Sequence, residues 1–115
     1  MIRKSFALLF GALFCASVFA GPASARTTVA SWYGPGLAGN PTASGERFDP
    51  GALTAAHRTI PMGSNLTVCH DGCVDVRVND RGPYLADREI DLSAAAAYEI
   101  GVSEKGVAAV EVHGA

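Results

Sequence analysis

Residues 65–80, NLTVCHDGCVDVRVND, decide the fold, because they read as two alternating strands joined by a tight turn. Apolar side chains recur at every second position, and these are Leu66, Val68, Val74, Val76 and Val78. A two-residue period is typical of strands with one buried face. The stretch therefore predicts a β-hairpin around HDG, residues 70–72.

Cys69 and Cys73 flank this connection on the faces opposite the apolar residues, so they can oppose each other across the hairpin. In an exported protein an even pair of cysteines predicts a disulfide. The stretch CHDGC could instead hold a metal ion, but zinc sites need four ligands and the sequence offers no second cluster. We therefore expect a disulfide, with no metal and no cofactor.

The first 25 residues have the pattern of a secretory signal peptide. Arg3 and Lys4 precede an uncharged, mostly apolar run over residues 5–20, and the small residues Ala23-Ser24-Ala25 follow. An uncleaved membrane anchor is the alternative, but the run is shorter than the roughly 20 residues that span a bilayer. We expect a signal peptide over residues 1–25 and one domain over residues 26–115.

The expected mature chain of 90 residues suits one small domain. Seven basic residues remain against eleven acidic ones, which gives a net charge of −4 with no basic cluster. Nucleic acid is therefore not expected as a partner, because phosphate binding depends on concentrated lysine and arginine.

Outside the hairpin the chain alternates between short strands and turns. TTVASWYG and VAAVEVHG read as the first and last strands, and GPGLAGNPTASGE reads as a long loop. A helix is predicted over residues 94–100, with Ser93 as its N-cap and Gly101 just past its end. Short strands, Gly- and Pro-rich turns and one brief helix indicate a small all-β barrel.

Three polar residues are candidates for chemistry. Asp80 continues the phase of the hairpin valines, which would point it to the core side at the barrel rim. It also precedes Gly82-Pro83, so a purely structural turn residue remains open. Glu46 ends the long loop and is either a site residue or a solvated side chain. His57 ends the run LTAAH and is either a site residue or an ordinary buried histidine.

Trp32 and Tyr33 alternate faces on the first strand, so one of them is expected in the core. The other is a candidate platform for a sugar ring, although ordinary barrel packing explains it as well.

Five stretches together resemble the successive motifs of the rare lipoprotein A family. They are ASWYG, TASGERFD, LTAAHRTIPMG, VRVNDRGPY and REIDLSAAAAYEIG, in order from about Val29 to Val112. The family's domain is a small six-stranded double-psi β-barrel, related in fold to expansins. The resemblance therefore implies that architecture for nearly the whole expected mature chain.

The family includes lytic transglycosylases that cut peptidoglycan, and the resemblance implies the same reaction here. It implies that Asp80, Glu46 and His57 are catalytic. Asp80 is the first choice for the general acid and base, and Glu46 is the second. His57 and Arg81 are expected to orient the carboxylates or the sugar, and Arg81, Tyr33 and Trp32 are the expected substrate-binding residues.

The expected substrate is the peptidoglycan glycan strand, and cell-wall or division proteins are further candidate partners. Many family members are lipoproteins, but Cys15 follows the bulky Phe14, so we expect a periplasmic protein with no stable membrane insertion after signal cleavage. The separate glycan-recognising domain of some members is not expected here. The alternatives are a non-catalytic, expansin-like glycan-binding module and a barrel that binds another protein.

Overall fold

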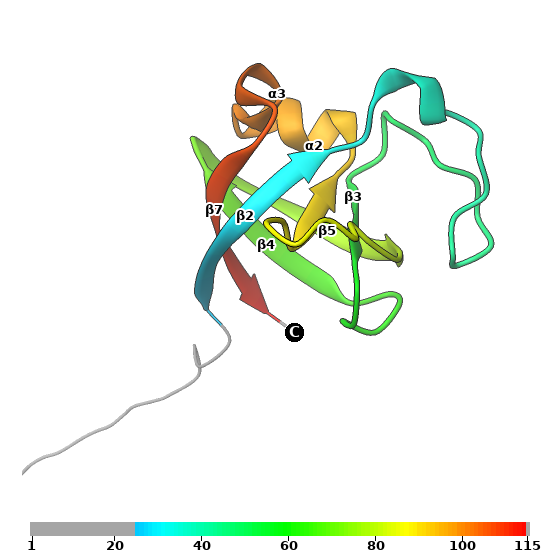
Figure 1. Ribbon diagram of the computed structural model, residues 1–115, viewed down its shortest axis with the longest axis horizontal. Coiled ribbons are helices and arrows are strands. Elements are labelled where there is room, and N and C mark those ends of the chain that lie inside the picture. The colour runs from blue at the N-terminus through cyan, green and yellow to red at the C-terminus, as the bar shows by residue number, and fades with distance from the viewer. Residues whose placement is uncertain (1–24, 115) are drawn as a thin grey trace, which may run out of the picture.

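Six strands close into a barrel in residues 25–114, the part of the chain that the computed structural model describes (Figure 1). Apart from Ala25, the predicted signal peptide lies outside the described residues, and so does Cys15. The order around the barrel is β2-β6-β3-β5-β4-β7. The strands are β2 (Arg26–Trp32), β3 (Thr54–His57), β4 (Asn65–His70), β5 (Gly72–Asp80), β6 (Ile90–Leu92) and β7 (Ala108–Gly114).

Two parallel strand pairs give the barrel its topology. β2 pairs in parallel with β6, and β3 pairs in parallel with β5, whereas the other four pairs are antiparallel. Parallel neighbours cannot be joined by a tight turn, so each pair brings together segments that are distant in the sequence. The predicted all-β double-psi barrel is confirmed.

The predicted hairpin is confirmed as β4 and β5. Its register opposes Leu66 to Val76 and Val68 to Val74, so the apolar residues share the inner face. Cys69 opposes Cys73, and the two are joined by a disulfide.

The helices cover one end of the barrel, at the top of Figure 1. The predicted helix is α2 (Ala94–Glu99), and the Ser93 hydroxyl caps it by accepting a 3.2 Å hydrogen bond from the Ala96 amide. Gly101 follows with φ 77° and leads into a second short helix, α3 (Val102–Lys105), which the sequence pattern did not predict. Within residues 25–114 no helix is long and apolar enough to cross a membrane.

A single main core fills the barrel and extends under the helices. Side chains from all six strands and from α2 and α3 contribute to it, and Trp32 packs against its edge. Its fully buried members include Leu66, Val78, Ile90, Leu92, Ile100, Val102 and Val112. A smaller second cluster, Tyr33, Phe48 and Ala56, is separate from this core.

The disulfide gives a prediction about stability. Replacing both Cys69 and Cys73 by serine should lower the free energy of unfolding by only about 1–2 kcal/mol, because the bridge closes a short loop within one hairpin. Urea unfolding followed by circular dichroism measures this. A double variant that does not fold would show that the bridge holds more than its own hairpin.

Candidate functional site

A β-bulge at the end of β5 moves Asp80 to the outer face of the barrel. Ala55 is the partner of Val78, but Ala56 is the partner of Asp80, so Asn79 is an extra residue in β5. An extra residue reverses the alternation that follows it. The prediction that Asp80 continues the inward phase of the valines is therefore wrong.

Three donors hold the Asp80 carboxylate in one orientation. The Tyr33 hydroxyl donates to Oδ2 at 2.7 Å, and the amides of Ala43 and Arg81 donate to Oδ1 at 2.8 and 2.9 Å. These donors come from the end of β2, from the long loop and from the turn after β5. Asp80 is thus the point at which three separate segments meet.

Tyr33 donates a hydrogen bond to Asp80 and is too buried to present its ring to a sugar. Its ring stacks on Phe48, with centroids 4.4 Å apart, and only 8% of the residue is exposed. Burial raises the pKa of Tyr33, and the hydrogen bond to Asp80 raises it further. The hydroxyl therefore stays protonated and remains a donor. Trp32 is partly buried and packs against the edge of the main core.

Asp91 is a second carboxyl group on the same face, and the sequence analysis missed it. It lies in β6 between Ser31 of β2 and Ala56 of β3, and Ala56 is also the partner of Asp80. The two aspartates therefore flank the small side chain of Ala56. The signal was in the sequence, since Asp91 lies between Ile90 and Leu92, which both point to the core.

The surroundings of Asp91 raise its pKa above the ordinary value of an aspartic acid. Burial raises the pKa of Asp91, and the negative charge of Asp80 adds to this rise. The Ser31 hydroxyl, which donates to Oδ1 at 3.0 Å, and the charge of Arg88 act in the opposite direction. General acid catalysis requires a carboxyl pKa raised toward the working pH, and the shift of Asp91 has this direction.

Glu46 lies at the rim beside the bulge. Its carboxylate accepts hydrogen bonds from Asn79 Nδ2 at 2.7 Å and from Arg77 Nη2 at 3.0 Å. The Asn79 bond, followed by the Arg77 interactions, lowers the pKa of Glu46, which is therefore ionised. The Ser44 amide also donates to the Asn79 carbonyl, so the loop that carries Glu46 is fastened to the end of β5.

His57 faces a different group of residues. Its Nδ1 accepts from the amides of Thr59 and Ile60, both at 3.1 Å, so Nε2 carries the proton and donates to Glu89 at 2.8 Å. Arg26 and Thr28 bind the same glutamate. Among residues 25–114 the His57 ring makes no hydrogen bond to Glu46, Asp80 or Asp91.

Arg81 connects His57 to Asp80 through the main chain. Its Nη1 donates to the carbonyls of His57 and Ile60 at 3.0 and 2.7 Å, while its amide donates to Asp80. These bonds hold the turn after β5 in place. They also occupy one end of the guanidinium that was predicted to bind substrate.

Tyr84 is an exposed aromatic residue close to this turn, and the sequence analysis did not single it out. It is 76% exposed, and a Cβ built on Gly82 would lie 3.7 Å from its ring. Arg58 donates to the carbonyls of Pro83 and Arg88, at 2.7 and 2.8 Å, and so braces the segment on both sides of Tyr84.

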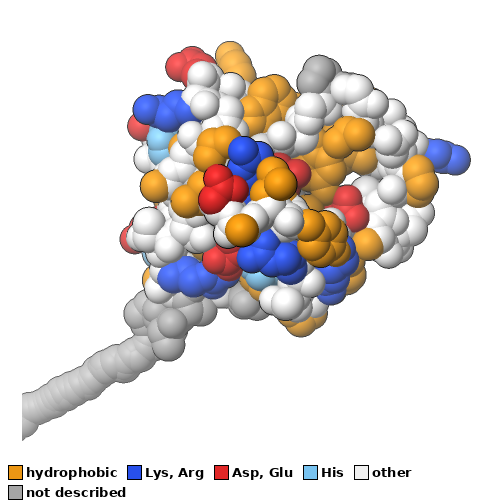
Figure 2. Space-filling view, viewed as in Figure 1, with side chains coloured by type: hydrophobic (Ala, Val, Ile, Leu, Met, Phe, Trp, Pro, Cys, Tyr) orange, Lys and Arg blue, Asp and Glu red, His pale blue; other side chains and the backbone are white. Residues whose placement is uncertain are grey.

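Glu46 is exposed, whereas Asp80 and Asp91 are half-buried. Figure 2 shows a hollow between the barrel and the loop of residues 34–50, with hydrophobic side chains at its base. No enclosed pocket is found in the described part of the chain. The candidate site consists of Asp80, Asp91 and Glu46 as acidic groups, with Tyr33 hydrogen-bonded to Asp80.

The chain is similar in sequence to peptidoglycan transglycosylases. A family model described as lytic transglycolase matches residues 25–112. The probable endolytic peptidoglycan transglycosylase RlpA of Synechocystis is 55% identical over 82 residues, which are 69% of this chain and 26% of that protein. The endolytic peptidoglycan transglycosylase RlpA of Pseudomonas aeruginosa is 50% identical over 88 residues, which are 74% of this chain and 26% of that protein. The chain thus spans about a quarter of the length of these relatives.

Solved structures support the fold. The Streptomyces papain inhibitor superposes with a TM-score of 0.64 at 21% identity, covering 80% of this chain and 94% of its own. A mutant expansin of Clavibacter michiganensis in complex with cellohexaose superposes with a TM-score of 0.64 at 17% identity, covering 79% of this chain and 50% of its own.

The Glu89 cluster gives a prediction about acid stability. The hydrogen bond from Arg26, followed by those from His57 and Thr28, lowers the pKa of Glu89 from 4.5 to about 2. Because the folded pKa is the lower one, this stabilisation is present above about pH 4.5 and is lost as the pH falls through about 2. Glu89→Gln should remove on the order of 2 kcal/mol of stability at neutral pH, since the partly exposed Arg26 partner is screened.

The measurement is the free energy of unfolding from pH 7 to pH 2 for Glu89→Gln, with exposed Glu104→Gln as the matched control. The difference from the unaltered chain should shrink toward acid pH for Glu89→Gln only. A difference that does not depend on pH would contradict the assignment of the ionised Glu89.

Proposed function

This chain belongs to the lytic transglycolase family, and we propose that it acts as an exported lytic transglycosylase that cleaves the glycan strands of peptidoglycan. The observation that carries the proposal is the pair of carboxyl groups, Asp80 and Asp91, on either side of Ala56. Export to the periplasm is part of the proposal and depends on the signal-peptide pattern of residues 1–25.

Asp91 is the proposed proton donor. In the reaction its carboxyl group gives a proton to the glycosidic oxygen, and the bond from that oxygen to C1 of N-acetylmuramic acid breaks. The resulting carboxylate then takes the proton of the sugar's own C6 hydroxyl, whose oxygen bonds to C1. A 1,6-anhydro end is left, no water is consumed and Asp91 is protonated again.

Asp80 is the proposed fixed carboxylate of the site. Its two oxygens accept hydrogen bonds from Tyr33, Ala43 and Arg81, which hold the carboxylate in one orientation. Its negative charge stabilises the positive charge that develops at C1. The same charge raises the pKa of Asp91, so Asp80 also helps to keep the acid protonated.

Glu46 and His57 have supporting roles in this proposal. Glu46 is ionised and lies at the rim, where its carboxylate can accept a hydrogen bond from a sugar hydroxyl. His57 is a positioning residue, because its carbonyl anchors the Arg81 side chain while the Arg81 amide binds Asp80. The hollow beside the loop of residues 34–50 is the proposed path of the glycan (Figure 2).

The first test is digestion of purified sacculi and of peptide-free glycan strands, with mass spectrometry of the released products. Asp91→Asn should lower turnover by about 10²–10⁴-fold, because it removes the transferable proton while nearly preserving shape. Asp80→Asn should also lower turnover strongly, and exposed Asp87→Asn is the control that should not. Asp91→Asn and Asp87→Asn should melt as the unaltered chain does, and circular dichroism checks that Asp80→Asn, which loses one accepting oxygen, still folds.

The pH profile separates the two aspartates. Ser31→Ala removes a donor that lowers the pKa of Asp91, so the alkaline limb of activity should move to higher pH while activity is kept.

Full activity of Asp91→Asn would refute Asp91 as the acid. If the unaltered chain binds sacculi but releases no anhydro product, an expansin-like binding module replaces the enzyme.

Tyr84 is the proposed sugar platform in place of Trp32 and Tyr33. Tyr84→Ala should weaken binding to sacculi by up to about tenfold, the scale of one aromatic contact, whereas Tyr84→Phe should retain binding. Tyr98 on α2 is 79% exposed and provides a matched control, Tyr98→Ala, in a co-sedimentation assay. Equal losses in both alanine variants would exclude a specific role for Tyr84.

A further inference from the structure

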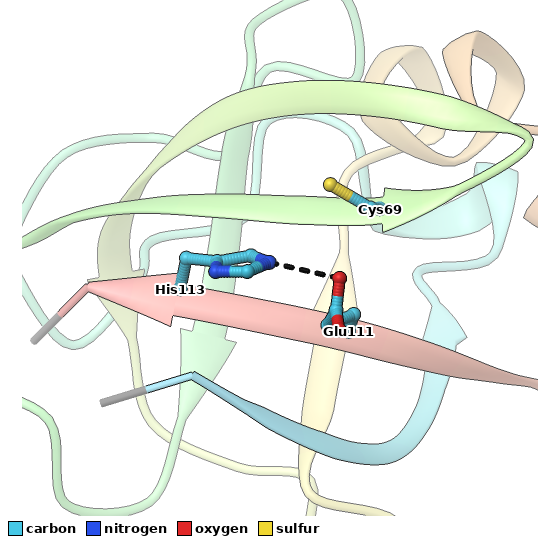
Figure 3. Close-up of side chains that lie close together, drawn as sticks. All are labelled: Cys69, Glu111 and His113. Carbon is cyan, nitrogen blue, oxygen red and sulfur yellow. Dashed lines mark hydrogen bonds and ion pairs between the residues drawn. The ribbon is translucent and has the colours of Figure 1, made fainter. Parts of the chain in front are cut away.

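A cysteine, a glutamate and a histidine meet on the outer face of β4 and β7, separate from the carboxyl groups of the proposed site. Cys69 of β4 is the partner of Glu111 of β7, and His113 lies two residues further along β7 (Figure 3). The Cys69 sulfur, a Glu111 oxygen and a His113 nitrogen all lie within 4.8 Å of one another. The alternation of β7 explains the placement, since Val110 and Val112 point to the core.

In the structure this group is incomplete as a metal site. The Cys69 sulfur is bonded to Cys73, and a disulfide sulfur lacks the negative charge of the thiolate that binds metals. Glu111 and His113 are then the two remaining ligands, joined by a 3.0 Å hydrogen bond. Two ligands do not make a protein zinc site.

We propose that reduction of the Cys69–Cys73 disulfide opens a four-ligand zinc site formed by Cys69, Cys73, Glu111 and His113. The reductant is a dithiol, which supplies two electrons and two protons, forms its own disulfide and leaves two cysteine thiols. Binding of Zn²⁺ then releases both thiol protons and gives two thiolate ligands. The carboxylate of Glu111 and the imidazole of His113 complete the tetrahedron.

The geometry and the donor set both favour zinc. Metal–ligand bonds of about 2.0–2.3 Å place tetrahedral ligand atoms roughly 3–4 Å apart. The ligand atoms of Cys69, Glu111 and His113 already lie within 4.8 Å of one another, and Cys73, the cross-strand partner of Cys69, would complete the set once the disulfide opens. Two thiolates, an imidazole and a carboxylate suit this borderline-soft cation better than calcium or magnesium. Glu111 and His113 are partly exposed, so the ion can reach them from solvent.

A zinc ion at this site would also crosslink the hairpin to β7. The disulfide joins β4 to β5, whereas a zinc ion held by all four residues would join β5, β4 and β7. None of the four residues belongs to the proposed catalytic group. The proposal therefore goes beyond the proposed function and can fail or succeed independently of it.

The test compares the purified full chain in its oxidised form with the same chain reduced on an immobilised dithiol resin, which is removed before metal is added. Zinc affinity is measured without oxygen, in competition with a chromophoric chelator. The reduced chain should bind one zinc ion and the bound ion should protect both thiols from alkylation. With Co²⁺ as a probe, the reduced chain should show thiolate-to-cobalt absorption that the oxidised chain lacks.

Two variants identify the ligands, and one control separates them from the rest of the hairpin. His113→Gln and Glu111→Gln should each weaken zinc binding by at least about 100-fold, because losing even an outer partner of a ligand costs 10–100-fold. His70→Gln should bind zinc as the unaltered chain does, since the His70 ring instead contacts the carbonyl of Ile100 at 2.7 Å. Circular dichroism of the reduced, metal-free variants confirms that each is folded.

Equal zinc affinity of the oxidised and reduced chains would overturn the proposal. So would unchanged binding in reduced His113→Gln with loss of binding in His70→Gln, because the ligand would then be the histidine of the hairpin turn. Activity on sacculi is measured in parallel on the oxidised chain and should be unaffected by either β7 variant.

Discussion

One extra residue in β5 determines where the proposed chemistry of this barrel takes place. Without the bulge at Asn79, Asp80 would follow Val78 into the core, where a carboxylate without partners is costly. With it, Asp80 lies on the outer face and accepts hydrogen bonds from Tyr33, Ala43 and Arg81. These bonds attach the long loop and the following turn to the barrel, so the local arrangement of the whole face depends on this one irregularity.

The two aspartates on this face differ because their surroundings differ. Asp80 has three donors directed at its oxygens, whereas Asp91 has one donor, is desolvated by burial and lies near the negative charge of Asp80. Desolvation and a neighbouring anion both penalise the ionised form, so the pKa of Asp91 rises. Two chemically identical side chains on either side of the buried Ala56 thereby become suited to different roles.

The hairpin of β4 and β5 forms between strands that are adjacent in the sequence, and β7, which is distant in the sequence, pairs with its β4 strand. Its register follows from its own alternation, and its disulfide joins residues only four positions apart. Glu111 and His113 are placed beside Cys69 only because β7 pairs with β4 when the barrel closes. The Cys69–Cys73 disulfide and the pairing of β4 with β7 therefore bring Cys69, Glu111 and His113 together.

The candidate site shows where prediction from local pattern ends. Glu46 and Ala43, both in the long loop, bind the end of β5. Glu46 accepts a hydrogen bond from Asn79, and the Ala43 amide donates to the adjacent Asp80. His57, which the same motifs suggested, turns instead to Glu89 because its Nδ1 is occupied by two main-chain amides. Asp91 was not predicted, because its raised pKa depends on burial and on Asp80, which the barrel brings near it from another strand.

The sequence by itself determined which side chains of the β4–β5 hairpin face the core as far as Val78, where α2 begins, and which cysteines are paired. These features depend on alternation, capping and turn chemistry within a few residues. Only the tertiary structure decided that β3 lies between β5 and β6, that the register slips at Asn79, and that Asp91 lies across Ala56 from Asp80. The physical reason is that a two-residue period specifies a face but not a neighbour. The neighbour of each strand is chosen by closure of the barrel, which minimises exposed strand edges and buries one shared core.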